Sequence, residues 1–171
     1  MKIKNKQLIE KYPFLLPKNV FTEELPTDYD YSFTWLDLMP EPWKKNFGEQ
    51  MCEEIKIVLN EEGLLEKFRI FDIKEKYGTL HLYSNFTTDK LDEVIRKYEN
   101  RSMMICVHCG KPTKWVSKGY ILFLCDECKT DDCLELTEKD VPTYTVFTKD
   151  GKYEVESFYK KEMQEQWKTN H

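Results

Sequence analysis

The chain is poor in the residues that most enzyme signatures require, with only 3 histidines and 6 glycines among its 171 residues. It contains no glycine-rich phosphate loop, no Gly-x-Ser-x-Gly elbow and no His-Glu-x-x-His helix motif. The histidines His81, His108 and His171 do not form the close pair that a nuclease metal site would need. The sequence therefore shows no catalytic constellation, and an enzyme with a site assembled from distant residues remains one alternative.

The sequence also lacks a long hydrophobic run and an excess of positive charge. No stretch of about 18 consecutive apolar residues occurs, so no membrane-spanning helix is expected. The basic start of the chain has no apolar stretch behind it, which is unlike a secretory signal and predicts a cytoplasmic protein with reduced thiols. The net charge of -5 argues against broad electrostatic binding of nucleic acids.

What the sequence does contain is two Cys-x-x-Cys pairs, Cys106 with Cys109 and Cys125 with Cys128. The intervening residues 110–124 are long enough for a hairpin that returns the chain to the same ion, which is the spacing of a four-cysteine zinc site. Four thiolates complete the coordination shell of Zn²⁺, so the sequence predicts one structural ion. Whether the finger is a zinc ribbon or a treble clef is open, and a helix beginning at Cys128 would favour the treble clef.

The pattern of apolar residues predicts helices and a hairpin before the cysteines. A short helix is expected over residues 1–11, and residues 42–62 and 88–103 carry the spacing of two amphipathic helices. Between them, residues 68–84 alternate like two strands joined by a tight turn, with Phe71 and Ile73 expected on one face. The fold class expected is α+β, with an antiparallel hairpin sheet packed by amphipathic helices.

Three regions follow from this pattern. Residues 1–104 are expected to form the α+β core, and residues 105–135 the zinc finger. Residues 136–171 contain an Asp-Gly turn signal between two strand-like stretches, followed by an apolar helical pattern. They are therefore predicted to form a C-terminal hairpin and helix, which pack on the core or on a partner.

An acidic segment with interleaved aromatic rings spans residues 21–42, where six carboxylates occur without a lysine or arginine. The carboxylates and rings are Glu23, Glu24, Asp28, Asp30, Asp37, Glu41, Phe21, Tyr29, Tyr31, Phe33 and Trp35. Aromatic side chains usually bury their area, which favours a loop lying on the core by its rings. The alternative is an acidic and aromatic recognition surface.

Residues 74–78 read Lys-Glu-Lys-Tyr-Gly and precede the cysteine finger that begins near Cys106. With this motif, residues 35–128 resemble an uncharacterised family of small bacterial and phage proteins, in which a Lys-Glu-Lys-Phe/Tyr-Gly strand-turn precedes a cysteine finger. The resemblance implies a prokaryotic or phage protein that is cytoplasmic and binds zinc. Because this motif recurs in the family, Lys74 and Lys76 are interpreted as an interaction or ligand-binding edge. His81 is assigned to the same edge, at a position where the family often has arginine.

Three functions are compatible with these sequence features. The first is a zinc-stabilised protein-interaction module, such as a regulator or inhibitor of a host protein encoded by a phage or mobile element. The second is a nucleic-acid-binding regulator that uses the finger, whose residues 106–129 have a charge of 4 - 2 = +2. The third is the enzyme mentioned above. A protein partner is expected, and its identity and the oligomeric state are not predicted.

Overall fold

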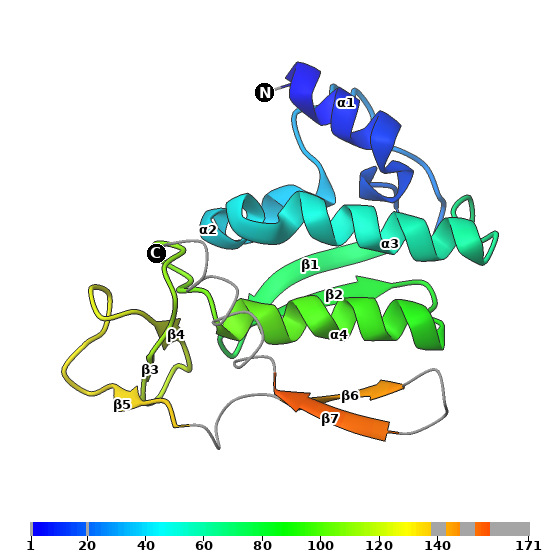
Figure 1. Cartoon of the computed structure of the whole chain (residues 1–171). Coiled ribbons are helices and arrows are strands. Elements are labelled where there is room, and N and C mark those ends of the chain that lie inside the picture. The colour runs from blue at the N-terminus through cyan, green and yellow to red at the C-terminus, as the bar shows by residue number, and fades with distance from the viewer. Residues whose placement is uncertain (1, 20, 138–142, 148–152, 158–171) are drawn as a thin grey trace.

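A computed structural model describes residues 2–19, 21–137, 143–147 and 153–157 of the chain. These residues form helices and small antiparallel sheets, so the predicted α+β class is confirmed at this level (Figure 1). Among the described residues, no helix has both the length and the apolar character needed to cross a membrane.

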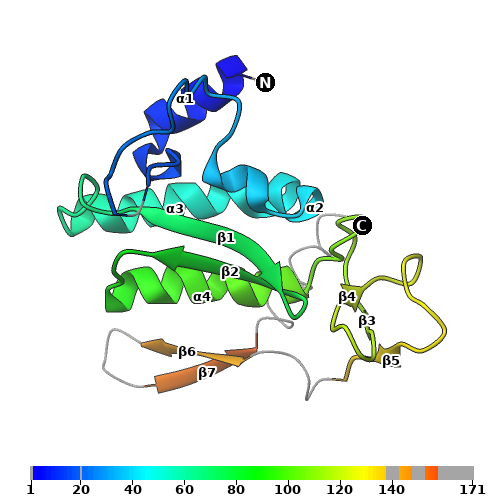
Figure 2. The same ribbon diagram turned by 180° about the vertical axis from the view of Figure 1, so that it is seen from behind.

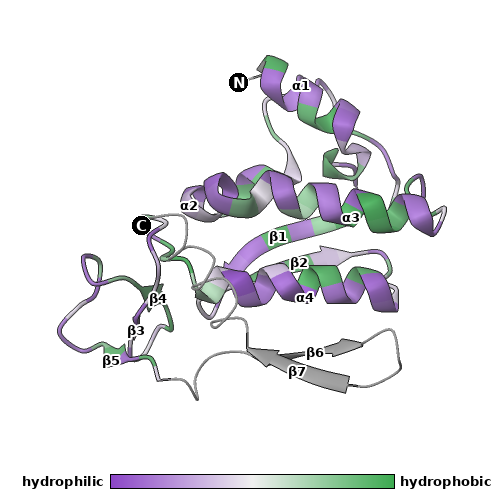
Figure 3. Cartoon of the chain, viewed as in Figure 1, coloured by the Kyte–Doolittle hydropathy of each residue, from purple (hydrophilic) through white to green (hydrophobic). Residues whose placement is uncertain are grey.

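The core consists of a hairpin covered on one face by two helices. The strands β1 (Ile70–Lys76) and β2 (Thr79–Ser84) pair antiparallel, and helices α3 (Glu49–Glu61) and α4 (Asp89–Met103) lie against the same face (Figures 1 and 2). Apolar residues recur along both helices with hydrophilic residues between them (Figure 3), so each helix buries one stripe.

Helix α4 begins where the sequence predicts, because Thr88 accepts a hydrogen bond from the backbone N–H of Leu91 at 3.4 Å and caps the helix. The other predicted long helix is interrupted near its start. A short helix α2 (Glu41–Trp43) leads into the π-helical turn η3 (Lys44–Gly48), which continues as α3. The π turn adds a residue to the helix, and no feature of the sequence pattern distinguishes it from regular helix.

The remaining segments close the core on the side of α3. Helix α1 (Lys2–Lys11) is followed by the short helices η1 (Pro13–Leu15) and η2 (Trp35–Leu38). The largest completely buried side chains of the core share an aromatic or aliphatic character. They are Trp43, Tyr12, Tyr98, Phe14, Phe47, Phe68, Leu15, Met51, Ile55, Leu59, Ile70 and Ile73.

A β-bulge in β1 changes which residues face the core. The pairing register shifts between Ile70 and Asp72, and this shift leaves Phe71 opposite no single partner. Ile70 and Ile73 are both buried, whereas Phe71 is only half-buried. The expectation that Phe71 and Ile73 lie on one face is therefore wrong, because strict alternation does not survive a bulge.

The outer edge of β2 is partly protected by a side chain from α4. The hydroxyl of Ser102 is completely buried and accepts the backbone N–H of Leu80 at 2.8 Å. This bond satisfies a strand N–H group on the side of β2 that does not pair with β1, so α4 covers part of that edge. The sequence pattern predicted α4 and not this role.

A pH-dependent stability difference is expected from Glu99. Burial raises the pKa of Glu99, while the N–H of Leu82 lowers it, and the net direction is upward. A raised pKa means that this carboxylate costs stability at pH 7 and that the cost disappears as the pH falls through the native pKa. Glu99→Gln should therefore unfold at a higher urea concentration than the parent at pH 7.

The advantage of Glu99→Gln should shrink as the pH is lowered toward 5. Urea titrations at a series of pH values measure it, with Glu93→Gln as the control because Glu93 is exposed on the same helix. An advantage for Glu99→Gln that does not change with pH would contradict this account of the buried carboxylate.

After α4 the chain enters the finger, residues 105–135. The strands β3 (Trp115–Val116), β4 (Phe123–Leu124) and β5 (Leu134–Glu135) form a three-stranded antiparallel sheet with β3 in the centre. No helix begins at Cys128, and residues 129–137 contain turns and β5.

The two strands of the predicted C-terminal hairpin pair antiparallel as β6 (Thr143–Phe147) and β7 (Tyr153–Ser157). The Asp-Gly turn between them and the predicted final helix over residues 158–167 lie outside the described residues. The division into regions 1–104, 105–135 and 136–171 stays a prediction.

Candidate metal centre

The two Cys-x-x-Cys pairs bring their four sulfur atoms together. The Sγ atoms of Cys106, Cys109, Cys125 and Cys128 all lie within 4.8 Å of one another, and Cys109 Sγ lies 3.4 Å from Cys125 Sγ. No disulfide joins these cysteines. Four sulfurs bound to Zn²⁺ at about 2.3 Å in a tetrahedron are separated by about 3.8 Å. The cluster therefore has the donor set and dimensions of a structural metal site.

Each pair sits in a tight backbone turn that directs amide groups toward the sulfurs. In the first turn, the backbone N–H of Gly110 donates to the carbonyl of Cys106 at 2.8 Å, and Gly110 has a φ of +80°. The N–H of Lys111 then faces the sulfur of Cys109. Such hydrogen bonds offset the charge of metal-bound thiolates.

The second turn, which carries Cys125 and Cys128, is closed by hydrogen bonds from the N–H groups of Cys128 and Lys129 to the carbonyl of Cys125, at 3.2 and 3.0 Å. Burial raises the pKa of Cys125. The hydrogen bonds that Cys125 accepts from Cys109 and from the backbone of Glu127 lower this pKa by more than burial raises it, to about 7. Burial and contacts with the other sulfurs raise the pKa of Cys128. Four thiolates in this space repel one another, and a bound cation would compensate that repulsion.

The finger has almost no hydrophobic core of its own. Its buried cluster contains Cys106, Leu124 and Cys125, with partly buried neighbours such as Trp115 and Leu122. Two of the three buried residues are candidate ligands, so apolar burial alone is too small to hold this sheet together. Folding of the finger is therefore expected to depend on the metal.

The first cysteine turn is docked on the helical side of the core. The indole N–H of the completely buried Trp43 donates to the carbonyl of Ile105 at 2.8 Å, directly before Cys106. A Cβ atom placed on Gly110 would lie 2.7 Å from Nδ2 of Asn46, so only glycine fits without a shift of that side chain. Trp43 and Asn46 thus place the finger against the start of the long helix.

The hairpin turn docks on the other side of the finger. Tyr77 and Gly78 form the two-residue turn with φ values of +53° and +79°, the backbone of a type I′ hairpin. A Cβ atom on Gly78 would lie 2.9 Å from the ring of Phe123 and 3.0 Å from the carbonyl oxygen of Ile121. The tip of the hairpin is therefore in direct contact with the finger sheet.

Glu75 ties this junction together through both of its carboxylate oxygens. Oε1 accepts the backbone N–H of Gly78 at 2.7 Å, and Oε2 accepts the hydroxyl of Tyr120 at 2.7 Å. The hydrogen bond to Glu75 raises the pKa of Tyr120. Glu75 of the Lys-Glu-Lys-Tyr-Gly motif thus holds the turn and joins it to the finger. The sequence pattern did not predict this role, because Tyr120 is 45 residues away.

The residues proposed as a binding edge, Lys74, Lys76 and His81, lie on the hairpin. Lys74 is exposed, forms an ion pair with Asp72 and lies over the ring of Tyr83 at 5.0 Å from its centroid. The Nζ of Lys76 lies 5.4 Å from the centroid of the neighbouring Tyr77 ring. The metal cluster includes none of them, and their role as a binding edge stays a prediction.

His81 lies between a hydroxyl and a carboxylate but lacks the geometry of a catalytic triad. Its Nε2 is 2.9 Å from Oγ1 of Thr79, while its Nδ1 is 3.9 Å from Oε1 of Glu99, too far for a hydrogen bond. The Thr79 hydroxyl is also 2.9 Å from the carbonyl of Lys76, to which it donates. This threonine is therefore occupied in the turn and is not activated as a nucleophile.

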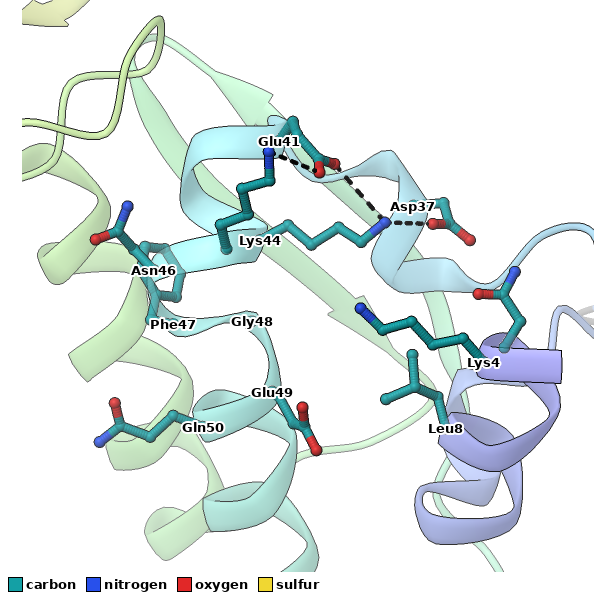
Figure 4. A pocket seen from close by; sticks show the side chains of 12 residues that line it. Lys4, Leu8, Asp37, Glu41, Lys44, Asn46, Phe47, Gly48, Glu49 and Gln50 are labelled. Atoms are coloured by element: carbon teal, nitrogen blue, oxygen red, sulfur yellow. Dashed lines mark hydrogen bonds and ion pairs between the residues drawn. The ribbon is translucent and has the colours of Figure 1, made fainter. Parts of the chain in front are cut away.

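A hollow of about 470 Å³ lies between α1 and the π turn (Figure 4). Within it, Lys44 Nζ lies 2.5 Å from Asp37 Oδ1 and 3.8 Å from Glu41 Oε2. Burial raises the pKa of Asp37, but Lys44 and Thr34 lower it more, so this carboxylate is ionised and paired. No histidine or cysteine lines the hollow, so it does not strengthen the enzyme alternative.

The fold and the cysteine cluster define a small α+β protein in which four clustered cysteines, able to hold a metal ion, are docked on a helix-and-hairpin core. Comparison of the chain with protein-family models, with curated proteins and with solved structures gives no match in any of the three.

Proposed function

We propose that this protein is a zinc-stabilised protein-interaction module, acting as a regulator or inhibitor of a host protein and encoded by a bacterium, phage or mobile element. Zinc is the ion best suited to four thiolates in a closed tetrahedral set, and such a set leaves no open position for catalysis. The three-stranded sheet and the absence of a helix between residues 129 and 137 favour a zinc ribbon over a treble clef.

The charges of the finger are the observation that favours a protein partner over nucleic acid. Three of the four lysines in residues 106–129 are engaged by side chains of the finger itself. These contacts join Lys111 with Glu127, Lys114 with Asp126, and Lys129 with the ring of Trp115. Binding of nucleic acid needs lysine or arginine side chains that are free to pair with phosphates and displace the counterions of the nucleic acid. The finger offers few such side chains.

Affinity capture from a bacterial lysate tests this proposal, with the zinc-loaded protein as bait in moderate salt. We expect one protein to be recovered in stoichiometric amount, with recovery unchanged after nuclease treatment. Recovery of nucleic acid that is lost as salt is raised, without such a protein, would instead support the nucleic-acid alternative.

Lys118→Glu is the matched variant for this experiment, because Lys118 is exposed and forms no ion pair with another described residue. Reversing the charge of Lys118 removes the fourth lysine of residues 106–129 without disturbing the metal site. A protein partner bound elsewhere should be retained by this variant, whereas nucleic acid bound through the finger should be lost.

A further inference from the structure

The acidic and aromatic segment borders an open groove that the metal centre does not use. The groove has a volume of about 590 Å³, and its lining includes Pro17, Pro26, Tyr29, Phe33 and Trp35. The rings of Phe33 and Trp35 pack edge to face with centroids 6.1 Å apart, and the Tyr29 hydroxyl donates to the carbonyl of Phe33 at 2.5 Å. These contacts hold an aromatic wall in place beside the two prolines.

The packing of this segment on the core is only partial. Tyr29 and Trp35 pack against the core cluster, as expected for a loop lying on the core by its rings. Phe21, in contrast, is 94% exposed, and Leu25 at the groove is 42% exposed. Some rings of the segment therefore pack on the core, and the rest of the segment borders an apolar groove.

The segment beside the groove carries an excess of negative charge. Glu23, Glu24 and Asp28 are exposed, and none of them forms an ion pair with another described residue. Among the residues that line the groove, Glu24 is the one carboxylate and Lys18 the one cation, so the excess lies at its border with Glu23 and Asp28. A ligand with positive charge would therefore be attracted to this side of the molecule.

We propose that this groove binds an extended, proline-containing segment of a partner protein that carries lysine or arginine. Proline rings stack on aromatic walls, and their pre-formed polyproline II backbone loses little entropy on binding. The basic side chains would lie against Glu24 and the neighbouring carboxylates. The inference rests on the proposed interaction function and names the chemistry of the partner.

A library of random twelve-residue peptides displayed on phage, selected against the zinc-loaded protein, is the direct probe. We expect enrichment of peptides that combine proline with lysine or arginine. For a synthetic copy of an enriched peptide, fluorescence anisotropy should show at least tenfold weaker binding to Phe33→Ala and to Glu24→Lys. Phe21→Ala should bind unchanged, because Phe21 is in the same segment but does not line the groove. Zinc content and circular dichroism verify that the variants are folded.

No enrichment, enrichment of peptides without proline or basic residues, or equal binding by Phe33→Ala and the parent would each overturn the groove proposal. The lysate experiment separates this failure from failure of the interaction function. A protein partner captured equally by the parent and by folded Phe33→Ala would leave the interaction function standing and remove the groove from it.

Discussion

Replacing Cys106 with serine is expected to abolish stoichiometric metal binding and to unfold the finger. Cys106 is completely buried and is one of three residues in the finger's own buried cluster. Zinc supplies on the order of 10 kcal/mol to the folding of small four-ligand domains, so loss of one ligand should cost well over about 3 kcal/mol. Metal analysis of the purified variant and its thermal unfolding curve measure the two effects.

Cys133→Ser is the matched control, because Cys133 is half-buried in the same finger but is not among the four clustered sulfurs. This control should retain one zinc ion per chain and a melting temperature close to that of the parent. Chelation of zinc from the parent should reproduce the behaviour of Cys106→Ser. A Cys106→Ser protein with one tightly held ion and an unchanged melting temperature would show that the site is not built as described.

Gly78→Ala is expected to destabilise the protein by about 2 to 5 kcal/mol and to loosen the junction between the hairpin and the finger. A left-handed backbone costs a non-glycine residue roughly 1–2 kcal/mol. The added methyl group would also lie 2.9 Å from the ring of Phe123, and overpacking of this kind costs about 1–3 kcal/mol more. Urea unfolding of the zinc-loaded protein gives the total loss.

Gly119→Ala separates the two contributions. Gly119 has nearly the same φ, +78°, but nothing lies within 4 Å of the place where its Cβ would be. It should therefore lose only the backbone contribution of roughly 1–2 kcal/mol. Equal losses in the two variants would mean that the contact between Gly78 and the finger does not contribute to stability.

Features set by neighbouring residues were predictable from the sequence. The Cys-x-x-Cys turns need only a few residues each, and residues 106–128 bring their own ligands together in the structure. Thr88 caps the helix that follows it, and apolar spacing marks α3 and α4. In each case the interaction joins residues close in the chain, so the local pattern carries the information.

Features set by contacts between distant segments could not be predicted in this way. The sequence pattern assigns Glu75 no role of its own, yet Glu75 holds Tyr120 of the finger. Ser102 reads as an ordinary helix residue, yet its hydroxyl accepts the backbone N–H of Leu80 at the edge of β2. No local pattern distinguishes a carboxylate or a hydroxyl that will find a partner across the fold.

The sequence by itself thus determined the α+β class and the four cysteines that converge on one point, because periodicity and short spacing constrain them directly. The tertiary structure decided that the hairpin tip with Gly78 docks on the finger and that Trp43 holds the chain beside Cys106. It also decided that the rings of residues 29–35 border a groove. The physical reason is that these arrangements depend on which surfaces meet when the core packs, and that packing depends on the whole chain at once.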